Sequence, residues 1–319
     1  MAAAVVVNEV SGGALVQSAR EYVRHGKAPA TLKAYALDCR EFLTWCESAA
    51  LADMPAAPST IALYIAWLAD AGRKVSTIQR RLAAISKAHQ VAGYESPASL
   101  KHAEVSEVWR GIRRVKGVAP TQKAPLLTAD LRAVFGAMPD TLIGLRDRAL
   151  LLLGFCAAVR RSELVALDTL SVENFRDGLT VTLSRSKTDQ EGEGRKIGVP
   201  YSADPATCPV RALQAWTEAA AITDGAIFRK IDRHGNVGSR LTPQAVALII
   251  KRRALEAGMD SSKLSGHSLR AGHATSAAMN GASERSIMNQ TGHKSTAMVR
   301  RYIRIADLFR ENSAMRLGL

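Results

Sequence analysis

Residues 266–270 read Gly266-His267-Ser268-Leu269-Arg270, and Thr291-Gly292-His293 and Tyr302 follow them near the C-terminal end of the chain. Apolar residues at helical spacing continue from the first segment, which predicts a helix that begins near Ser265 and Gly266. Because His267 and Arg270 are three residues apart, we expect them side by side on one face of that helix. Thr291-Gly292-His293 is predicted to end the next short helix and to present a second imidazole at a turn.

The side chains of these segments are suited to binding and attacking a phosphate group. An arginine that stays charged, beside an imidazole near a helix N-terminus, is a site for an oxyanion. Tyr302 is expected on a helix that begins near Ser295, where Arg300, Arg301 and Arg304 surround it and can stabilise its phenolate. A stabilised phenolate is a candidate nucleophile. The alternative is a tyrosine packed on the domain surface, with its hydroxyl bonded to a backbone carbonyl.

The composition indicates a globular protein that binds a polyanion. A chain of 319 residues with 47% hydrophobic residues is long enough for two domains with their own cores. The formal net charge is +14 and the pI is about 10.0, so nucleic acid is the first candidate partner. A soluble protein that is merely basic is the alternative.

The sequence favours a cytoplasmic, DNA-associated protein. No apolar run is long enough to span a bilayer, and the opening apolar residues lack a basic head and are interrupted by Asn8 and Glu9. The four cysteines have no paired spacing, so we expect buried thiols in a reducing compartment. They are Cys39, Cys46, Cys156 and Cys208.

Residues 1–117 predict a bundle of four or five helices without a strand, after a frayed start at residues 1–10. Several basic residues are expected on the outward sides of these helices, where they either contact DNA phosphates or are simply solvated. They are Arg80, Arg81, Lys87, Arg110, Arg113 and Arg114. Residues 118–125, with two prolines and no periodicity, are the best linker in the chain.

Residues 126–319 predict a second domain that is mainly α with a small antiparallel β-sheet. An apolar helix over 142–159 is its expected core element and leads directly into Arg160. Three strands are predicted over 170–175, 179–184 and 196–200, and the turn between the last two holds Lys187. Helices follow over 209–221 and 243–257, then the helices of the first motifs and a short amphipathic tail helix over 305–319.

The ordered set of Arg160, Lys187, the His267–Arg270 pair, His293 and Tyr302 is more specific than any one member. In this order the chain resembles the tyrosine recombinases, the family of phage integrases and Xer recombinases. Residues 160–164 resemble the family's first box, 267–283 its second box, and Gly292-His293 with Tyr302 nine positions after the histidine its third. Two departures are Ala157-Ala158 in place of the usual Thr-Gly, and a long acidic loop after Lys187.

The resemblance implies a core-binding, SAM-like domain over residues 1–117 and a catalytic domain over 126–319, which close on DNA as a C-shaped clamp. It implies site-specific recombination through a 3′-phosphotyrosine and a Holliday junction, with no cofactor, metal or ATP. The residues fit these roles, because two guanidiniums can hold the non-bridging oxygens of a phosphodiester. The implied roles are attack by Tyr302, phosphate binding by Arg160, Arg270, His267 and His293, protonation of the 5′-oxygen by Lys187, and support by Glu163.

Several alternatives stay open at this point. Arg185 or Lys196 is an alternative to Lys187, and Glu163 orients either Arg160 or His267. A metal site from His267, His273 and His293 lacks a carboxylate or thiolate in register, and His273 is better explained as a packed helix residue. A non-catalytic DNA-binding protein, a type IB topoisomerase and a telomere resolvase would share many of these groups.

The resemblance also implies double-stranded DNA with inverted-repeat sites as partner, and a homotetramer on that DNA. In such an assembly the tail would dock on a neighbouring protomer through an apolar anchor of Leu308, Phe309 and Met315. The alternative is a tail that packs on its own domain.

Overall fold

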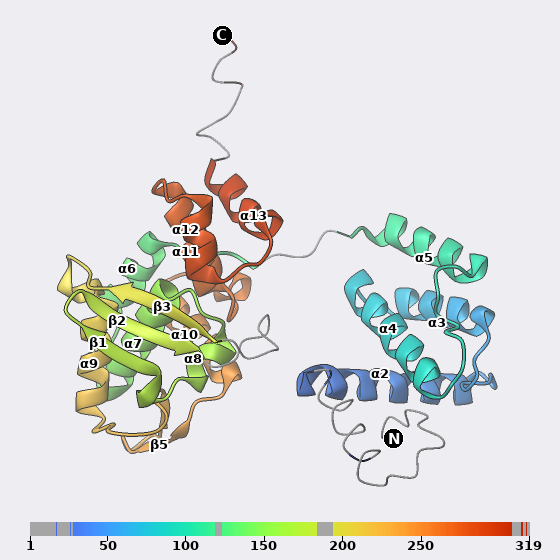
Figure 1. The fold of residues 1–319 in the computed structure, drawn as a ribbon, viewed down its shortest axis with the longest axis horizontal. Coiled ribbons are helices and arrows are strands. Elements are labelled where there is room, and N and C mark those ends of the chain that lie inside the picture. Colours follow the sequence, from blue (N-terminus) through green and yellow to red (C-terminus); the bar gives the residue numbers. More distant parts are fainter. Residues whose placement is uncertain are drawn as a thin grey trace. The chain divides into compact units, whose positions relative to one another are not determined.

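The structure is a computed structural model that describes residues 28–118, 123–183 and 194–307, together with the single residues 17, 26, 314 and 317. These residues divide between two compact units, Met1–Thr121 and Gln122–Leu319, each of which has its own core (Figure 1). Among the helices of the described ranges, none is long and apolar enough to cross a membrane.

The first unit is a bundle of the helices α2 (Pro29–Ser48), α3 (Pro58–Asp70), α4 (Val75–Val91) and α5 (Ala103–Lys116). Its described residues form no strand, as the sequence predicted. Proline opens α2 and α3, where its fixed φ suits the first turn and its missing N–H costs nothing. Side chains from all four helices, including Phe42, Tyr64, Ile85 and Trp109, make the core.

Arg81 on α4 is buried, although the sequence predicted an outward side chain. Its side chain donates to the hydroxyl of Tyr64 over 3.0 Å and forms ion pairs with Asp38 and Glu41. Only 4% of Arg81 is exposed, and a buried guanidinium needs such counter-charges to offset its lost hydration. The prediction was therefore wrong on this point, and Arg81 is not available for contacts with DNA phosphates.

The second unit is built around α7 (Leu142–Cys156), which packs against α9 (Pro209–Ala219) and α11 (Ser268–Met279). Most of α7 is buried, as expected for the central core element. The helix ends at Cys156, earlier than the predicted residue 159, because Ala158 adopts a left-handed conformation with φ of 51°. The remaining helices are α6 (Thr128–Gly136), α8 (Arg161–Ala166), α10 (Pro243–Glu256), α12 (Glu284–Thr291), α13 (Thr296–Asp307) and the short 3-10 helices η1 (Thr169–Ser171), η2 (Pro205–Thr207) and η3 (Ser261–Lys263).

The strands β1 (Val172–Phe175), β2 (Gly178–Leu183) and β3 (Arg195–Pro200) form an antiparallel sheet in the order β1-β2-β3. The strands of this sheet were predicted. A second antiparallel pair, β4 (Arg229–Ile231) with β5 (Val237–Arg240), was not predicted, because its strands are short, rich in charged and polar residues, and do not alternate with apolar ones.

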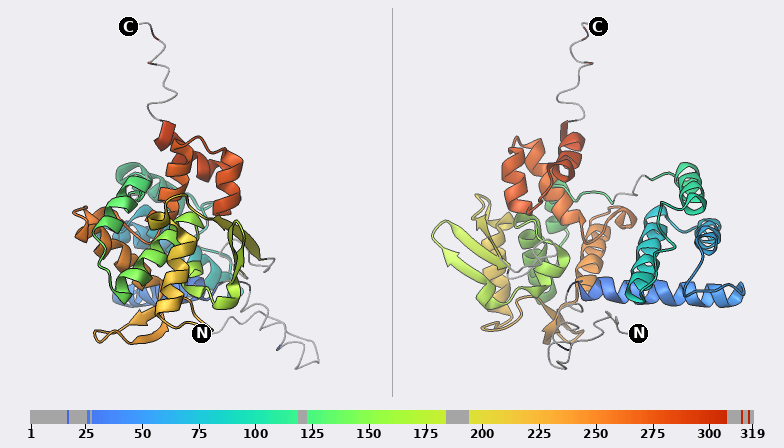
Figure 2. Two further views of the ribbon diagram at one scale, coloured as in Figure 1. Left: turned by 90° about the vertical axis from the view of Figure 1, so that its left-hand side faces the viewer. Right: turned by 45° about the vertical axis from the view of Figure 1, so that its right-hand side comes forward.

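The helices α11, α12 and α13 lie side by side at one end of the second unit (Figure 1 and Figure 2). Their contact is a small core of Ala274, Ala278, Ile287 and Val299, against which Tyr302 packs. Because alanine side chains are small, those on α11 let α13 approach closely. This layer carries the C-terminal motifs and brings them to α7 and α8.

Candidate active site

Arg160 and Glu163 are joined by two hydrogen bonds at the start of α8. The backbone N–H of Arg160 donates to Glu163 Oε2 over 2.8 Å, and its guanidinium donates to Oε1 over 2.6 Å. Glu163 is 5% exposed, so its charge is balanced mainly by this arginine. Of the two partners considered for Glu163, Arg160 is therefore bonded to it directly.

Arg270 is buried in the first turn of α11, with 4% of the residue exposed. Its Nη1 donates to the carbonyl oxygen of Ala158 over 2.6 Å, so the turn before Arg160 also holds Arg270. Its Nη2 is buried and has no hydrogen-bond partner among the described residues. Burial, with the neighbouring Arg160 charge, lowers the pKa of Arg270 to about 10, and the group stays protonated at neutral pH.

His293 lies directly after Gly292, the left-handed residue that ends α12. The ring is 9% exposed, and its Nδ1 lies 2.7 Å from the hydroxyl oxygen of Thr291. Burial lowers the pKa of His293 to about 4, and the charges of Arg270, Arg160 and Arg195 act in the same direction. The imidazole is therefore neutral at pH 7.

Tyr302 is half-buried on α13, with its ring centroid 6.1 Å from that of His293. It interacts electrostatically with Arg270. The sequence predicted Arg300 and Arg301 around the phenol, but Arg300 pairs with Glu284 over 3.3 Å and Arg301 is exposed. The side chain of Arg304 lies outside the described residues.

His267 occupies the N-cap position of α11, so the helix begins after it rather than near Ser265. Its backbone N–H donates to the Ser265 hydroxyl over 3.2 Å, and the residue is exposed. Arg270 follows three residues later and is buried, so the two predicted groups lie at the same end of α11 with different exposure.

Other predicted groups lie outside the described residues. They are Lys187, its alternative Arg185, and the apolar tail residues Leu308, Phe309 and Met315. Lys196, the other alternative, is described: its side chain is 68% exposed and its ammonium lies 3.9 Å from Glu173.

Arg195, to which the sequence assigned no role, also belongs to this site. It is the first residue of β3, and its charge interacts with Arg160, Glu163, Arg270 and His293. A basic residue at the base of a hairpin is common, so no sequence signal separated it from its neighbours. The site thus contains three guanidiniums, one carboxylate, one neutral imidazole and one phenol among the described residues.

His273 and the cysteines belong to the packing of the domains. The His273 ring meets Phe155 edge-on at 5.8 Å, and burial lowers its pKa to about 4. In the described part of the chain, no three His, Cys, Asp or Glu residues are grouped in a way that could hold a metal ion. The four cysteines are free thiols. Two of them are buried and two are half-buried, which agrees with a role in packing.

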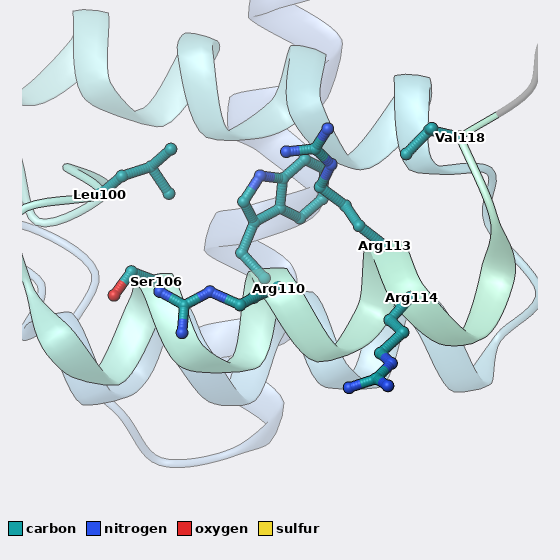
Figure 3. A pocket seen from close by; sticks show the side chains of 7 residues that line it. Leu100, Ser106, Arg110, Arg113, Arg114 and Val118 are labelled. Atoms are coloured by element: carbon teal, nitrogen blue, oxygen red, sulfur yellow. The ribbon is translucent and has the colours of Figure 1, made fainter.

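The basic residues predicted to contact DNA lie on the first unit. Arg80 pairs with Asp38 over 2.8 Å and Lys87 is exposed. Arg110, Arg113 and Arg114 reach from neighbouring turns of α5 and line one pocket (Figure 3). This face of α5 is exposed and basic.

Comparison with known proteins agrees with this fold. The Phage integrase family matches residues 126–308, and the Phage integrase N-terminal SAM-like domain matches residues 20–95. The chain is 40% identical over 304 residues to an integrase/recombinase xerD homolog of Selenomonas ruminantium, covering 94% of this chain and 88% of the relative. It is 27% identical over 277 residues to tyrosine recombinase XerC of Pseudomonas aeruginosa, covering 85% of this chain and 83% of the relative.

Solved structures have the same fold. A lambda integrase dimer bound to a COC′ core site aligns with a TM-score of 0.62 at 16% identity, covering 93% of this chain and 77% of that chain. The XerH site-specific recombinase bound to difH substrate aligns with a TM-score of 0.61 at 16% identity, covering 96% and 91%. The chain belongs to the phage integrase family, the tyrosine recombinases. The predicted fold class and the predicted function in site-specific recombination are thereby confirmed.

Proposed function

We propose that this recombinase cleaves and rejoins DNA through a covalent 3′-phosphotyrosine at Tyr302 and a Holliday junction. The observation that carries the proposal is the buried Nη2 of Arg270, which has no hydrogen-bond partner among the described residues. A buried cationic N–H without an acceptor is costly unless a ligand supplies one. The phosphodiester is an anionic acceptor of the right kind, and the charges of Arg160 and Tyr302 both interact with Arg270.

The groups divide the chemistry between them. Arg160 and Arg270 bind the two non-bridging oxygens and stabilise the charge that develops on them. Tyr302 Oη forms a bond to phosphorus as the bond to the 5′-oxygen breaks. Lys187 gives its proton to that oxygen, while His267 takes the proton of the phenol. Glu163 keeps Arg160 in place through its two hydrogen bonds.

His293 acts as a neutral donor in this scheme. With a pKa of about 4 the ring carries one N–H at pH 7. The Thr291 hydroxyl donates its one proton to the carbonyl oxygen of Ile287 over 2.7 Å, so in the structure its oxygen accepts from Nδ1–H of His293. Donation from Nε2 to a phosphate oxygen therefore requires this hydroxyl to turn from Ile287 to Nδ1 when DNA binds.

The reaction needs neither metal nor ATP in this proposal. The guanidiniums supply the positive charge that a metal ion supplies in other phosphoryl transfers. The phosphotyrosine bond conserves the energy of the phosphodiester, so the strand is rejoined without an energy source.

Binding is proposed to involve both units. Residues 1–117 act as a core-binding domain and 126–319 as the catalytic domain, and they clamp a duplex with inverted-repeat sites. The positive charge and the exposed arginines of α5 support phosphate contacts. Four protomers assemble on DNA, with the tail of each docked on a neighbour.

The proposal is tested with a nicked, site-containing duplex that traps the cleaved state. The wild type should form an adduct that survives denaturing gels. Tyr302→Phe should form none, while its DNA affinity stays within about threefold, because the phenol contributes little to ground-state binding. Tyr201→Phe, at an exposed tyrosine of the same unit, is the matched control and should form the adduct. An adduct that persists in Tyr302→Phe contradicts the proposal.

A further inference from the structure

Arg195 reaches from the sheet to the end of α12. It is the first residue of β3, opposite Leu183 in the register of β2. Its Nη1 donates to the carbonyl oxygens of Asn289 and Gln290 over 3.3 and 3.4 Å. The last carbonyls of a helix lack partners inside the helix and lie at its negative end, so a guanidinium there stabilises the helix terminus.

Gly292 makes room for this guanidinium. The residue has φ of 66°, which suits glycine, and its N–H donates to Met288 over 2.7 Å to close the helix. A Cβ at this position would lie 2.7 Å from the Arg195 Cζ, closer than such atoms approach. The turn therefore favours glycine before His293, and any larger residue there would have to displace the Arg195 guanidinium.

A second side chain ties the same helix end to the rest of the domain. Gln290 Nε2 donates to the carbonyl oxygen of Cys156 over 2.8 Å and to that of Gly198 over 3.1 Å. Cys156 ends α7, just before the turn that holds Arg160 and Arg270. Arg195 and Gln290 thus fix the segment from which His293 extends.

We propose that Arg195 is a positioning residue for strand cleavage, a role that rests on the proposed function of the site. Its guanidinium fixes the end of α12 against β3 and so keeps His293 beside Tyr302. It also adds a third positive charge to the surroundings of Arg160 and Arg270. Small displacements of a donor in a phosphoryl-transfer site have large effects on rate, so the loss of this anchor should slow cleavage rather than binding.

The experiment measures single-turnover cleavage of a nicked, site-containing duplex at saturating protein, beside DNA affinity. Arg195→Ala should cleave about 10- to 100-fold more slowly, with affinity within about threefold. Arg195→Lys should recover several-fold more rate than Arg195→Gln, because the ammonium keeps both the charge and a donor. Arg176→Ala is the matched control, since it removes an exposed cation from the turn between β1 and β2 of the same sheet and should cleave at the wild-type rate.

A spectroscopic readout separates positioning from a general loss of structure. Removal of Arg195 takes away one of the charges that lower the pKa of His293, so this pKa should rise in Arg195→Ala when followed by NMR. The melting temperature reports the fold independently. Three results would overturn the inference: cleavage by Arg195→Ala at the rate of Arg176→Ala, an unchanged His293 pKa, or a loss of affinity with an unchanged saturated rate. A wild type that forms no adduct would instead contradict the proposed function.

A substitution at Gly292 tests the contact between this residue and the Arg195 guanidinium. Gly292→Ala should slow cleavage, because the new methyl group meets the guanidinium and strains the turn. When Arg195 is already alanine, the new methyl group no longer meets a guanidinium. Gly292→Ala should therefore reduce the cleavage rate of Arg195→Ala less than it reduces that of the wild type. Equal effects in both backgrounds would mean that the two positions are not coupled, and would overturn the inference.

Discussion

At the residue scale, the site depends on which groups are kept charged and which are kept neutral. Arg160, Arg195 and Arg270 are neighbouring cations, and the carboxylate that interacts with them is that of Glu163. Two histidines beside them, His273 and His293, are held neutral with pKa values of about 4. An imidazole that stays neutral at pH 7 does not add to the electrostatic repulsion among the three arginines, and it keeps one N–H as a hydrogen-bond donor.

The depressed pKa values predict that mild acid destabilises the folded domain. A histidine with a pKa of about 6.5 in the unfolded chain and about 4 in the folded domain binds protons better when unfolded. The free energy of unfolding should therefore be highest above pH 6.5 and fall as the pH drops through that value. The loss should reach about 1–2 kcal/mol per histidine at pH 5.

Denaturant titrations at pH 7 and pH 5 measure this effect. His293→Gln should lose less stability between the two pH values than the wild type, because it lacks one of the two imidazoles with a lowered pKa. His234→Gln, at an exposed histidine of the β4–β5 hairpin, is the control and should behave as the wild type does. An identical loss in His293→Gln and the wild type would contradict the buried, neutral imidazole.

At the element scale, the turn between α7 and α8 joins the buried core helix to the residues of the candidate active site. Ala158 adopts φ of 51° in this turn, and its carbonyl accepts the hydrogen bond from Arg270. Its neighbour Ala157 has φ of −77°, in the helical region. The same substitution should therefore have opposite effects at the two positions.

Ala158→Gly should raise the free energy of unfolding by about 0.5–1 kcal/mol, because glycine adopts the left-handed conformation without strain. Ala157→Gly should lower it by a similar amount, since it only adds freedom to the unfolded chain. Chemical denaturation of both variants measures the difference. A loss of stability in Ala158→Gly as large as that in Ala157→Gly would show that the turn is not strained.

The elements that the sequence predicted are those with a clear apolar period or a long continuous apolar run. The buried α7, the sheet of β1 to β3 and the helices of the C-terminal motifs belong to this group. The β4–β5 hairpin and the break at Ala158 were missed, because one has short charged strands and the other has an alanine where glycine is usual. Arg195 was missed because its role arises from contacts with residues 289 and 290, which are distant in the sequence.

At the scale of the whole molecule, the net charge of +14 includes both exposed and buried cations, and the two kinds differ in their access to DNA. Arg113 and Arg114 are exposed on α5, and Arg110 is exposed with Glu107 as its ion-pair partner. Arg81, by contrast, is enclosed by acidic side chains and Tyr64. Only the exposed arginines of α5 are able to contact DNA phosphates and displace counterions.

Replacement of Arg110, Arg113 and Arg114 by Gln should make the slope of log affinity against log salt shallower by about 2 to 3, since each phosphate contact contributes about 0.9. Arg81→Gln is the contrasting variant. It should leave the slope unchanged but cost about 1–3 kcal/mol of stability, because the buried Tyr64 hydroxyl loses its hydrogen-bond donor while Asp38 keeps its ion pair with Arg80. DNA-binding isotherms at several salt concentrations and denaturation curves measure the two effects. An unchanged slope in the triple variant would remove α5 from the DNA interface.

Mass spectrometry of the trapped adduct can identify the proposed bond between Tyr302 and the 3′-phosphate of the cleaved strand. Arginines at 301 and 304 flank the segment, so trypsin should release Tyr302-Ile303-Arg304 with the nucleotide attached. We expect a phosphotyrosine in this tripeptide, linked to a DNA 3′-end, and a free 5′-hydroxyl on the released strand. A nucleotide attached to any other residue, or a linkage through a 5′-phosphate, would contradict it.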